Sequence, residues 1–169
     1  MGRKTHAILA ILGAFWLTSC GVETASAQGR EPPYWASLRY DETNMRVGPS
    51  REYHIEWVYR RKGLPVRVLR SRDEWDLVQD PEGTQGWISG SQLSRTRTVL
   101  ITGNAIVALR EEPQAASRLL WRAEPGVVAQ LLRCQKDWCE IDASGRTGWV
   151  KASQLWGDEN VVAEEREAG

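Results

Sequence analysis

Aromatic rings and fixed cations gather in one short segment in the first half of the chain. Its members are Tyr53, Trp57, Tyr59, Arg60, Arg61 and Lys62. Aromatic faces beside guanidinium and ammonium groups suit sugar rings and anionic carboxylates. The segment therefore predicts a ligand-binding site for such groups. A run of three charges is also typical of a solvated turn, and this alternative stays open.

No catalytic motif accompanies these residues. The chain has no Gly-x-Ser-x-Gly, no Gly-x-x-x-x-Gly-Lys and no His-Glu-x-x-His. No pair of acidic residues stands out as the two catalytic carboxyl groups of a glycosidase, because the acidic residues cluster in turns and in the C-terminal tail. His54 is the one histidine beyond the first thirty residues, which argues against zinc. We therefore expect a non-enzymatic protein with no metal and no cofactor.

Cys134 and Cys139 bracket a tight turn. A hairpin that turns at Lys136-Asp137 would place Cys134 opposite Cys139 and Gln135 opposite Trp138. Opposed residues in a non-hydrogen-bonded pair lie about 4.5 Å apart at Cα, within the range of a disulfide. We predict a structural disulfide that stabilises the fold by roughly 2 kcal/mol. A redox role is disfavoured because the spacing is not Cys-x-x-Cys.

The elements that must position these residues follow from an internal repeat. Met45-Arg46 and Trp57 recur 64 positions later as Leu109-Arg110 and Trp121. The same order continues to the end of each unit, where the offset has shrunk to 62: Gly86-Trp87 and Ser91-Gln92-Leu93 recur as Gly148-Trp149 and Ser153-Gln154-Leu155. Chance would not produce this ordered series, so one structural unit is built twice.

Within each unit the apolar residues alternate with polar ones. Leu64, Val66 and Val68 are one example, and this period of two predicts half-buried strands separated by turns. We expect an all-β fold of two tandem, small, partly open β-barrels at residues 34–95 and 98–156. Because a unit of about sixty residues has only a marginal core, the two barrels should pack together.

Four tryptophans occupy matched positions in the two units: Trp75, Trp87, Trp138 and Trp149. Strand parity places them on the outer face if the β-branched residues fill the barrel. There they either pack, between the repeats or along an edge, or meet a ligand, and packing is the favoured interpretation. Parity also puts Asp76 on the core side, which predicts either a rim position or a β-bulge.

The N-terminus has the layout of a bacterial secretory signal, with a basic start and an apolar run too short to span a bilayer. Ala25-Ser26-Ala27 predicts cleavage that removes residues 1–27. Leu17-Thr18-Ser19-Cys20 resembles a lipobox, so removal of residues 1–19 and lipidation of Cys20 is the alternative. Either one implies a periplasmic or cell-envelope protein, in contact with membrane only through the signal or a lipid anchor.

The charge balance excludes another class. Lys and Arg number 22 and Asp and Glu number 22, so we expect no nucleic-acid partner, because such proteins concentrate basic residues. Residues 157–169 are rich in acidic side chains and are predicted to form a disordered, solvating tail.

Several motifs of the first unit carry a family resemblance: residues 44–50 (Asn-Met-Arg-Val-Gly-Pro-Ser), Gly63-Leu64-Pro65-Val66, Glu74-Trp75 and Gly86-Trp87-Ile88. They resemble the signature of bacterial SH3-like (SH3b) domains, and more narrowly that of exported proteobacterial proteins formerly grouped as a domain of unknown function. The resemblance implies a five- to six-stranded barrel, an envelope-facing binding role and no catalytic residues. The second unit departs from the signature, with Glu111-Glu112 in place of Val47-Gly48.

Together these features predict a non-enzymatic binding module that recognises an envelope component, either peptidoglycan or a periplasmic protein, through repeat 1. A structural adaptor for protein–protein interaction and an accessory subunit of a cell-wall hydrolase are the alternatives.

Overall fold

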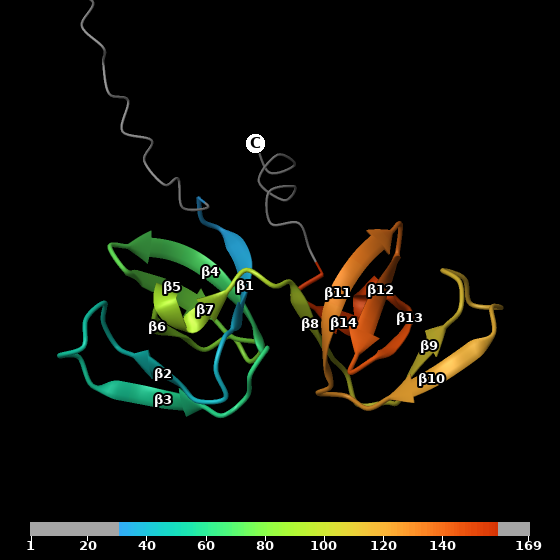
Figure 1. Cartoon of the computed structure of the whole chain (residues 1–169), viewed down its shortest axis with the longest axis horizontal. Coiled ribbons are helices and arrows are strands. Elements are labelled where there is room, and N and C mark those ends of the chain that lie inside the picture. The colour runs from blue at the N-terminus through green and yellow to red at the C-terminus, as the bar shows by residue number, and fades with distance from the viewer. Residues whose placement is uncertain (1–30, 159–169) are drawn as a thin grey trace, which may run out of the picture.

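The computed structural model describes residues 31–158, which form two β-sheets that follow one another along the chain (Figure 1). The first sheet contains β1 (Tyr34–Leu38), β2 (Thr43–Arg46), β3 (Ile55–Tyr59), β4 (Pro65–Arg72), β5 (Trp75–Gln79), β6 (Gln85–Ser89) and β7 (Leu93–Ser94). The second contains β8 (Thr98–Ile101), β9 (Val107–Arg110), β10 (Leu119–Ala123), β11 (Val128–Gln135), β12 (Trp138–Ala143), β13 (Arg146–Lys151) and β14 (Leu155–Trp156).

The two sheets have the same topology. The first has the strand order β3-β2-β6-β5-β4-β1-β7, and the second has the matching order β10-β9-β13-β12-β11-β8-β14. Within the described residues the helical segments are two three-residue 3-10 turns, η1 (Gly90–Gln92) and η2 (Ala152–Gln154). The predicted all-β fold of two tandem SH3-like units is therefore confirmed, with seven strands per unit because the short β7 and β14 also join the sheets.

Each unit buries its own apolar face. The first core is centred on residues that solvent does not reach, among them Met45, Val66 and Ile88. The second core has Ile101, Leu109, Ile141 and Val150 in the same role. Met45 and Leu109 alternate with half-buried neighbours, because successive side chains of a strand point to opposite faces. β8 is instead buried along its whole length.

Contacts across the connection between β7 and β8 join the two units. Leu100 of β8 packs into the first core. The hydroxyl of Thr98 donates to the carbonyl oxygen of Gly63 at 2.7 Å, and the rings of Trp35 and Trp156 meet edge to face with centroids 4.5 Å apart. The predicted packing of the barrels against each other is thus present, at the first strand of one unit and the last strand of the other.

The matched tryptophans pack within their own repeats. Trp87 is 8% exposed and lies under the guanidinium of Arg70, 5.5 Å from the ring centroid. Trp149 is 5% exposed and lies under Arg133 in the same way, at 5.2 Å. Packing is therefore the role of Trp87 and Trp149, whereas Trp75 and Trp138 are half-buried and line open hollows. The predicted packing of matched tryptophans between the repeats is wrong for Trp87 and Trp149, because the tryptophans in contact across the junction are Trp35 and Trp156.

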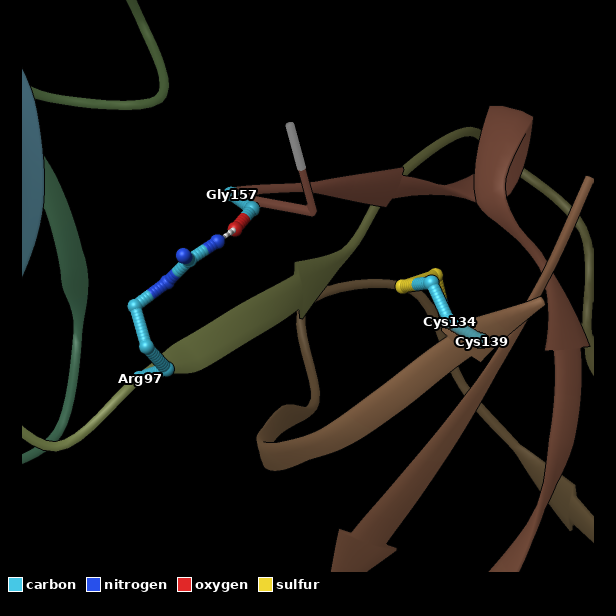
Figure 2. Close-up of a disulfide and its surroundings, with 4 residues drawn as sticks. All are labelled: Arg97, Cys134, Cys139 and Gly157. Carbon is cyan, nitrogen blue, oxygen red and sulfur yellow. Dashed lines mark hydrogen bonds between the residues drawn. A yellow bond between two sulfur atoms is a disulfide. The ribbon is translucent and has the colours of Figure 1, made fainter. Parts of the chain in front are cut away.

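The β11–β12 hairpin has the register expected from the sequence. Cys134 pairs with Cys139 and Gln135 with Trp138. The two cysteines form a disulfide with a Cα–Cα distance of 4.0 Å (Figure 2). Lys136 takes the turn with a positive φ of 52°. The predicted disulfide is confirmed.

The ends of the chain bear on three predictions. The signal, with Cys20 and both cleavage alternatives, lies outside the described residues, as do residues 159–169 of the expected tail. Gly157 was expected to begin that tail, but it is buried, and its carbonyl oxygen accepts a hydrogen bond from Arg97 at 2.8 Å (Figure 2). Between residues 31 and 158, no helix is long and apolar enough to cross a membrane.

Candidate functional site

An open groove of about 570 Å³ lies where repeat 1 meets repeat 2. Four residues of the predicted binding segment line it, namely Trp57, Tyr59, Arg60 and Arg61. Leu100 and Gly126 contribute a wall from repeat 2. The groove therefore belongs to both units, and neither alone would form it.

Trp57 supplies the exposed aromatic surface of this groove. It lies on β3, the edge strand of the first sheet, and 58% of the side chain is exposed. Its neighbour Val58 is also exposed and lines the groove. An exposed indole is costly to leave in water unless other groups cover it, which makes this ring a candidate ligand contact.

Tyr59 is placed differently from the prediction. Its ring is 6% exposed and belongs to the first core. The hydroxyl donates to Oδ2 of Asp80 at 2.8 Å. Burial, followed by the hydrogen bond and charge of Asp80, raises the pKa of Tyr59, so the phenol stays neutral. Tyr59 thus supports the floor of the groove and does not offer a free aromatic face.

Asp80 uses its other oxygen to hold the β5–β6 turn. Oδ1 accepts hydrogen bonds from the backbone N–H groups of Glu82 at 3.1 Å and Thr84 at 2.8 Å. Glu82 and Thr84 line the same groove as the basic residues. The sequence identified this segment as a turn, but it contained no signal that the turn faces Trp57.

The basic run divides among three environments. Arg60 forms an exposed ion pair with Glu42 at 3.9 Å. Arg61 donates from its guanidinium to the carbonyl oxygen of Gly126, and so reaches from repeat 1 into repeat 2. Lys62 is exposed and is not one of the residues found to line the groove. Two of the three predicted cations therefore border the site.

Tyr53 lies apart from the groove, in the loop between β2 and β3. Its ring packs on Gly48, where an added Cβ would lie 2.6 Å from the ring atoms. Nη1 of Arg46 donates to the carbonyl oxygens of Arg51 at 3.0 Å and of Tyr53 at 2.5 Å, which holds this loop. Tyr53 and Trp57 are thus not brought together in one site, because Tyr53 is not among the residues that line the groove.

Repeat 2 places a cation over the ring that corresponds to Trp57. Trp121 occupies the position of Trp57, and the guanidinium of Arg146 lies over its ring at 5.3 Å from the centroid. Trp121 is 43% exposed. Repeat 1 has Thr84 at the place of Arg146, and its short side chain cannot extend over an indole in this way.

A metal centre has no support in the described part of the chain, residues 31–158, where no group of three His, Cys, Asp or Glu side chains could hold an ion.

Two seven-stranded units with one topology, joined through their first and last strands, define a tandem SH3-like protein. The model of the bacterial SH3 domain matches residues 39–95 and 103–157, one match for each unit. The chain belongs to the bacterial SH3 domain family.

Two solved structures are among the proteins to which this chain is similar. One is NlpC2 from Trichomonas vaginalis, at 13% identity and a TM-score of 0.34, covering 76% of this chain and 49% of that one. The other is NlpC1 from the same organism, at 14% identity and a TM-score of 0.33, covering 76% and 47%. This chain thus spans about half the length of these proteins. Among curated proteins, none matches the chain significantly.

Proposed function

We propose that the protein is a non-enzymatic, exported module that binds peptidoglycan of the cell envelope through the groove of repeat 1. The observation that carries the proposal is the bare indole of Trp57 beside Arg60 and Arg61, in a groove with walls from both units. Membership of the bacterial SH3 domain family supports the same function, because an envelope-facing binding role is what the resemblance to this family implies.

The chemistry of the groove suits a glycan that carries peptide carboxylates. The face of an indole packs against the C–H groups of a sugar ring, and guanidinium groups bind carboxylates through paired hydrogen bonds. The exposed Arg60–Glu42 pair is weak, so Arg60 can exchange its partner for a ligand carboxylate. Arg61 uses one contact on Gly126 and keeps further N–H donors, because a guanidinium has five.

Co-sedimentation with purified sacculi tests this proposal. Trp57→Ala should weaken binding about tenfold, which corresponds to the loss of one well-packed aromatic contact. Arg60→Ala combined with Arg61→Ala should weaken it further and reduce its dependence on salt. Trp121→Ala is the matched control, because it removes the corresponding ring of repeat 2, and it should leave binding unchanged. Binding that survives the Trp57 and arginine variants would overturn the glycan site.

A periplasmic protein is a second candidate partner, because the edge strand β3 is exposed on both faces. Ile55 and Val58 add apolar surface beside Trp57, and an uncovered strand edge is a common place for another chain to pair. Affinity capture from periplasm with the wild type and the Val58→Lys variant tests this candidate. A protein retained by the wild type and lost with the variant would favour the adaptor function over the glycan.

A further inference from the structure

A second hollow, of about 490 Å³, lies in repeat 2 and shares no lining residue with the groove of repeat 1. It is found between the tip of the β11–β12 hairpin and the turn η2. Its walls include Lys136, Asp137 and Trp138 from the hairpin, and Lys151, Ala152 and Ser153 from the other side.

Two lysines, Lys136 and Lys151, line this hollow together with Trp138. Lys151 pairs directly with Trp138 across the β12–β13 ladder, and Lys136 sits at the hairpin tip two residues before Trp138. Within residues 31–158 neither lysine takes part in an ion pair. Asp137 is the one acidic residue of the lining, so the hollow has a net positive charge.

Covalent and backbone contacts hold the rim of the hollow in place. The Cys134–Cys139 disulfide lies one register step from the Gln135–Trp138 pair. The backbone N–H of Ala152 donates to the carbonyl oxygen of Asp137 at 2.9 Å and so ties η2 to the hairpin tip. Because these groups are ordered before a ligand arrives, binding loses less conformational entropy.

The positive charge is particular to repeat 2. Where repeat 2 has Lys136 and Lys151, repeat 1 has Asp73 and Ser89. The hollow at this place in repeat 1 is lined instead by acidic residues, Asp73 and Glu74 among them, with Arg51. The shared fold therefore does not require two lysines beside the tryptophan, since the first unit forms the same hairpin without them.

We propose that this hollow is a second binding site, which takes the carboxylate of a short peptide. The two ammonium groups would hold the carboxylate by charge-assisted hydrogen bonds, and the ring of Trp138 would pack against an adjacent apolar side chain. The site is independent of the groove in repeat 1, so the protein would hold its partner at two places with different chemistry.

Titration of the full chain with N-acetyl-dialanine, followed by the NMR signal of the Trp138 indole N–H, tests the proposal. The free carboxylate should shift this signal in a saturable, salt-sensitive way, and the C-terminal amide of the same peptide should bind at least tenfold more weakly. Lys136→Gln and Lys151→Gln should each weaken binding about threefold, as expected for exposed charge pairs. Lys62→Gln, an exposed lysine in repeat 1, is the matched control and should change nothing.

Equal binding of acid and amide, or full binding by the Lys136→Gln/Lys151→Gln double variant, would overturn the site. A blocked peptide with one internal glutamate identifies the source of the carboxylate: tighter binding than the dialanine acid assigns an acidic side chain, and weaker binding assigns a chain end. Trp57→Ala should leave every one of these titrations unchanged, so failure of this site and failure of the groove are distinguishable.

Discussion

The two repeats connect the strands of the same hairpin at the same position by different bonds. In repeat 2, Cys134 and Cys139 face each other and form a disulfide. In repeat 1 the corresponding pair is Ser71 and Asp76, and the serine hydroxyl donates to the carboxylate at 2.5 Å. One fold thus accepts a covalent bond or a hydrogen bond at one register. We therefore expect the stability of repeat 2 to depend on redox conditions and that of repeat 1 to depend on pH.

A second difference concerns function. Trp57 and Trp121 occupy the same strand position, but Arg146 covers only the second ring. In repeat 2 the exposed tryptophan already contacts a cation of its own unit, whereas in repeat 1 the face of Trp57 is open to a ligand. Duplication of a unit can in this way give its two copies different exposed surfaces without any change of topology.

The largest effect is expected where the repeats are alike. Trp87→Ala and Trp149→Ala should each lower the free energy of unfolding by about 3–5 kcal/mol, because each removes a large buried side chain. Denaturant unfolding of the two variants measures the losses. Losses that differ by more than about 2 kcal/mol would show that the outer faces of the repeats are not equivalent.

The disulfide should give the next largest effect. Reduction, or the double variant Cys134→Ser/Cys139→Ser, should destabilise the protein by roughly 2 kcal/mol. Hydrogen exchange should locate the loss in β11 and β12, with β4 and β5 unaffected. Equal loss of protection in the two hairpins would mean that the repeats unfold as one unit and that the cross-link does not distinguish them.

Asp76 should make repeat 1 sensitive to pH. Burial raises the pKa of Asp76, although the hydrogen bond from Ser71 opposes the shift. Because the folded state favours the protonated acid, this group stabilises fully below its ordinary pKa of 3.8 and loses that contribution as pH rises through the raised pKa.

Asp76→Asn therefore should match or exceed the wild type at pH 7, by at most about 1 kcal/mol, and lose this advantage in acid. Unfolding of both proteins at several pH values measures the difference. Ser71→Ala is the control that removes the hydrogen bond and keeps the carboxyl. A difference between wild type and Asp76→Asn that grows in acid in favour of the variant would contradict the assignment.

The smallest effect separates the two exposed tryptophans. Trp121→Ala should cost about 0.5–1 kcal/mol of stability, since it removes a cation–π contact with Arg146. Trp57→Ala should change stability by less than about 0.5 kcal/mol, as is usual for an exposed position. Thermal unfolding measures both variants. A larger loss for Trp57→Ala would indicate that its ring supports the fold and does not serve a ligand.

Much of the architecture was predictable because its signals are local. Alternation of apolar residues identifies the buried face of a strand, and the spacing of Cys134 and Cys139 across a two-residue turn defines their pairing. Asp76 raised two alternatives, a position at the rim of the core or a β-bulge. The structure has a bulge between Val68 and Arg70, but it lies on β4; β5 pairs regularly, so Asp76 stays on the same face as Val78 and is buried. The hydrogen bond that Asp76 accepts from Ser71 was not predicted, because Ser71 belongs to the partner strand β4.

The candidate site was only partly predictable for the same reason. Trp57, Arg60 and Arg61 were identified from their residue types. Tyr59 was expected at the site but is buried, where its hydroxyl donates a hydrogen bond to Asp80, 21 residues away along the chain. The contact of Arg61 with Gly126 spans 65 residues. No periodic pattern in the sequence indicates contacts between residues so far apart along the chain.

The sequence by itself determined the duplication, the all-β class, the disulfide and the residue types available for binding, because each depends on neighbours along the chain. The tertiary structure decided which rings stay exposed, which cations reach across the junction and where the hollows lie. Strand parity states which face a side chain takes, but the residue that meets it there comes from a strand distant in sequence, and only folding brings the two together.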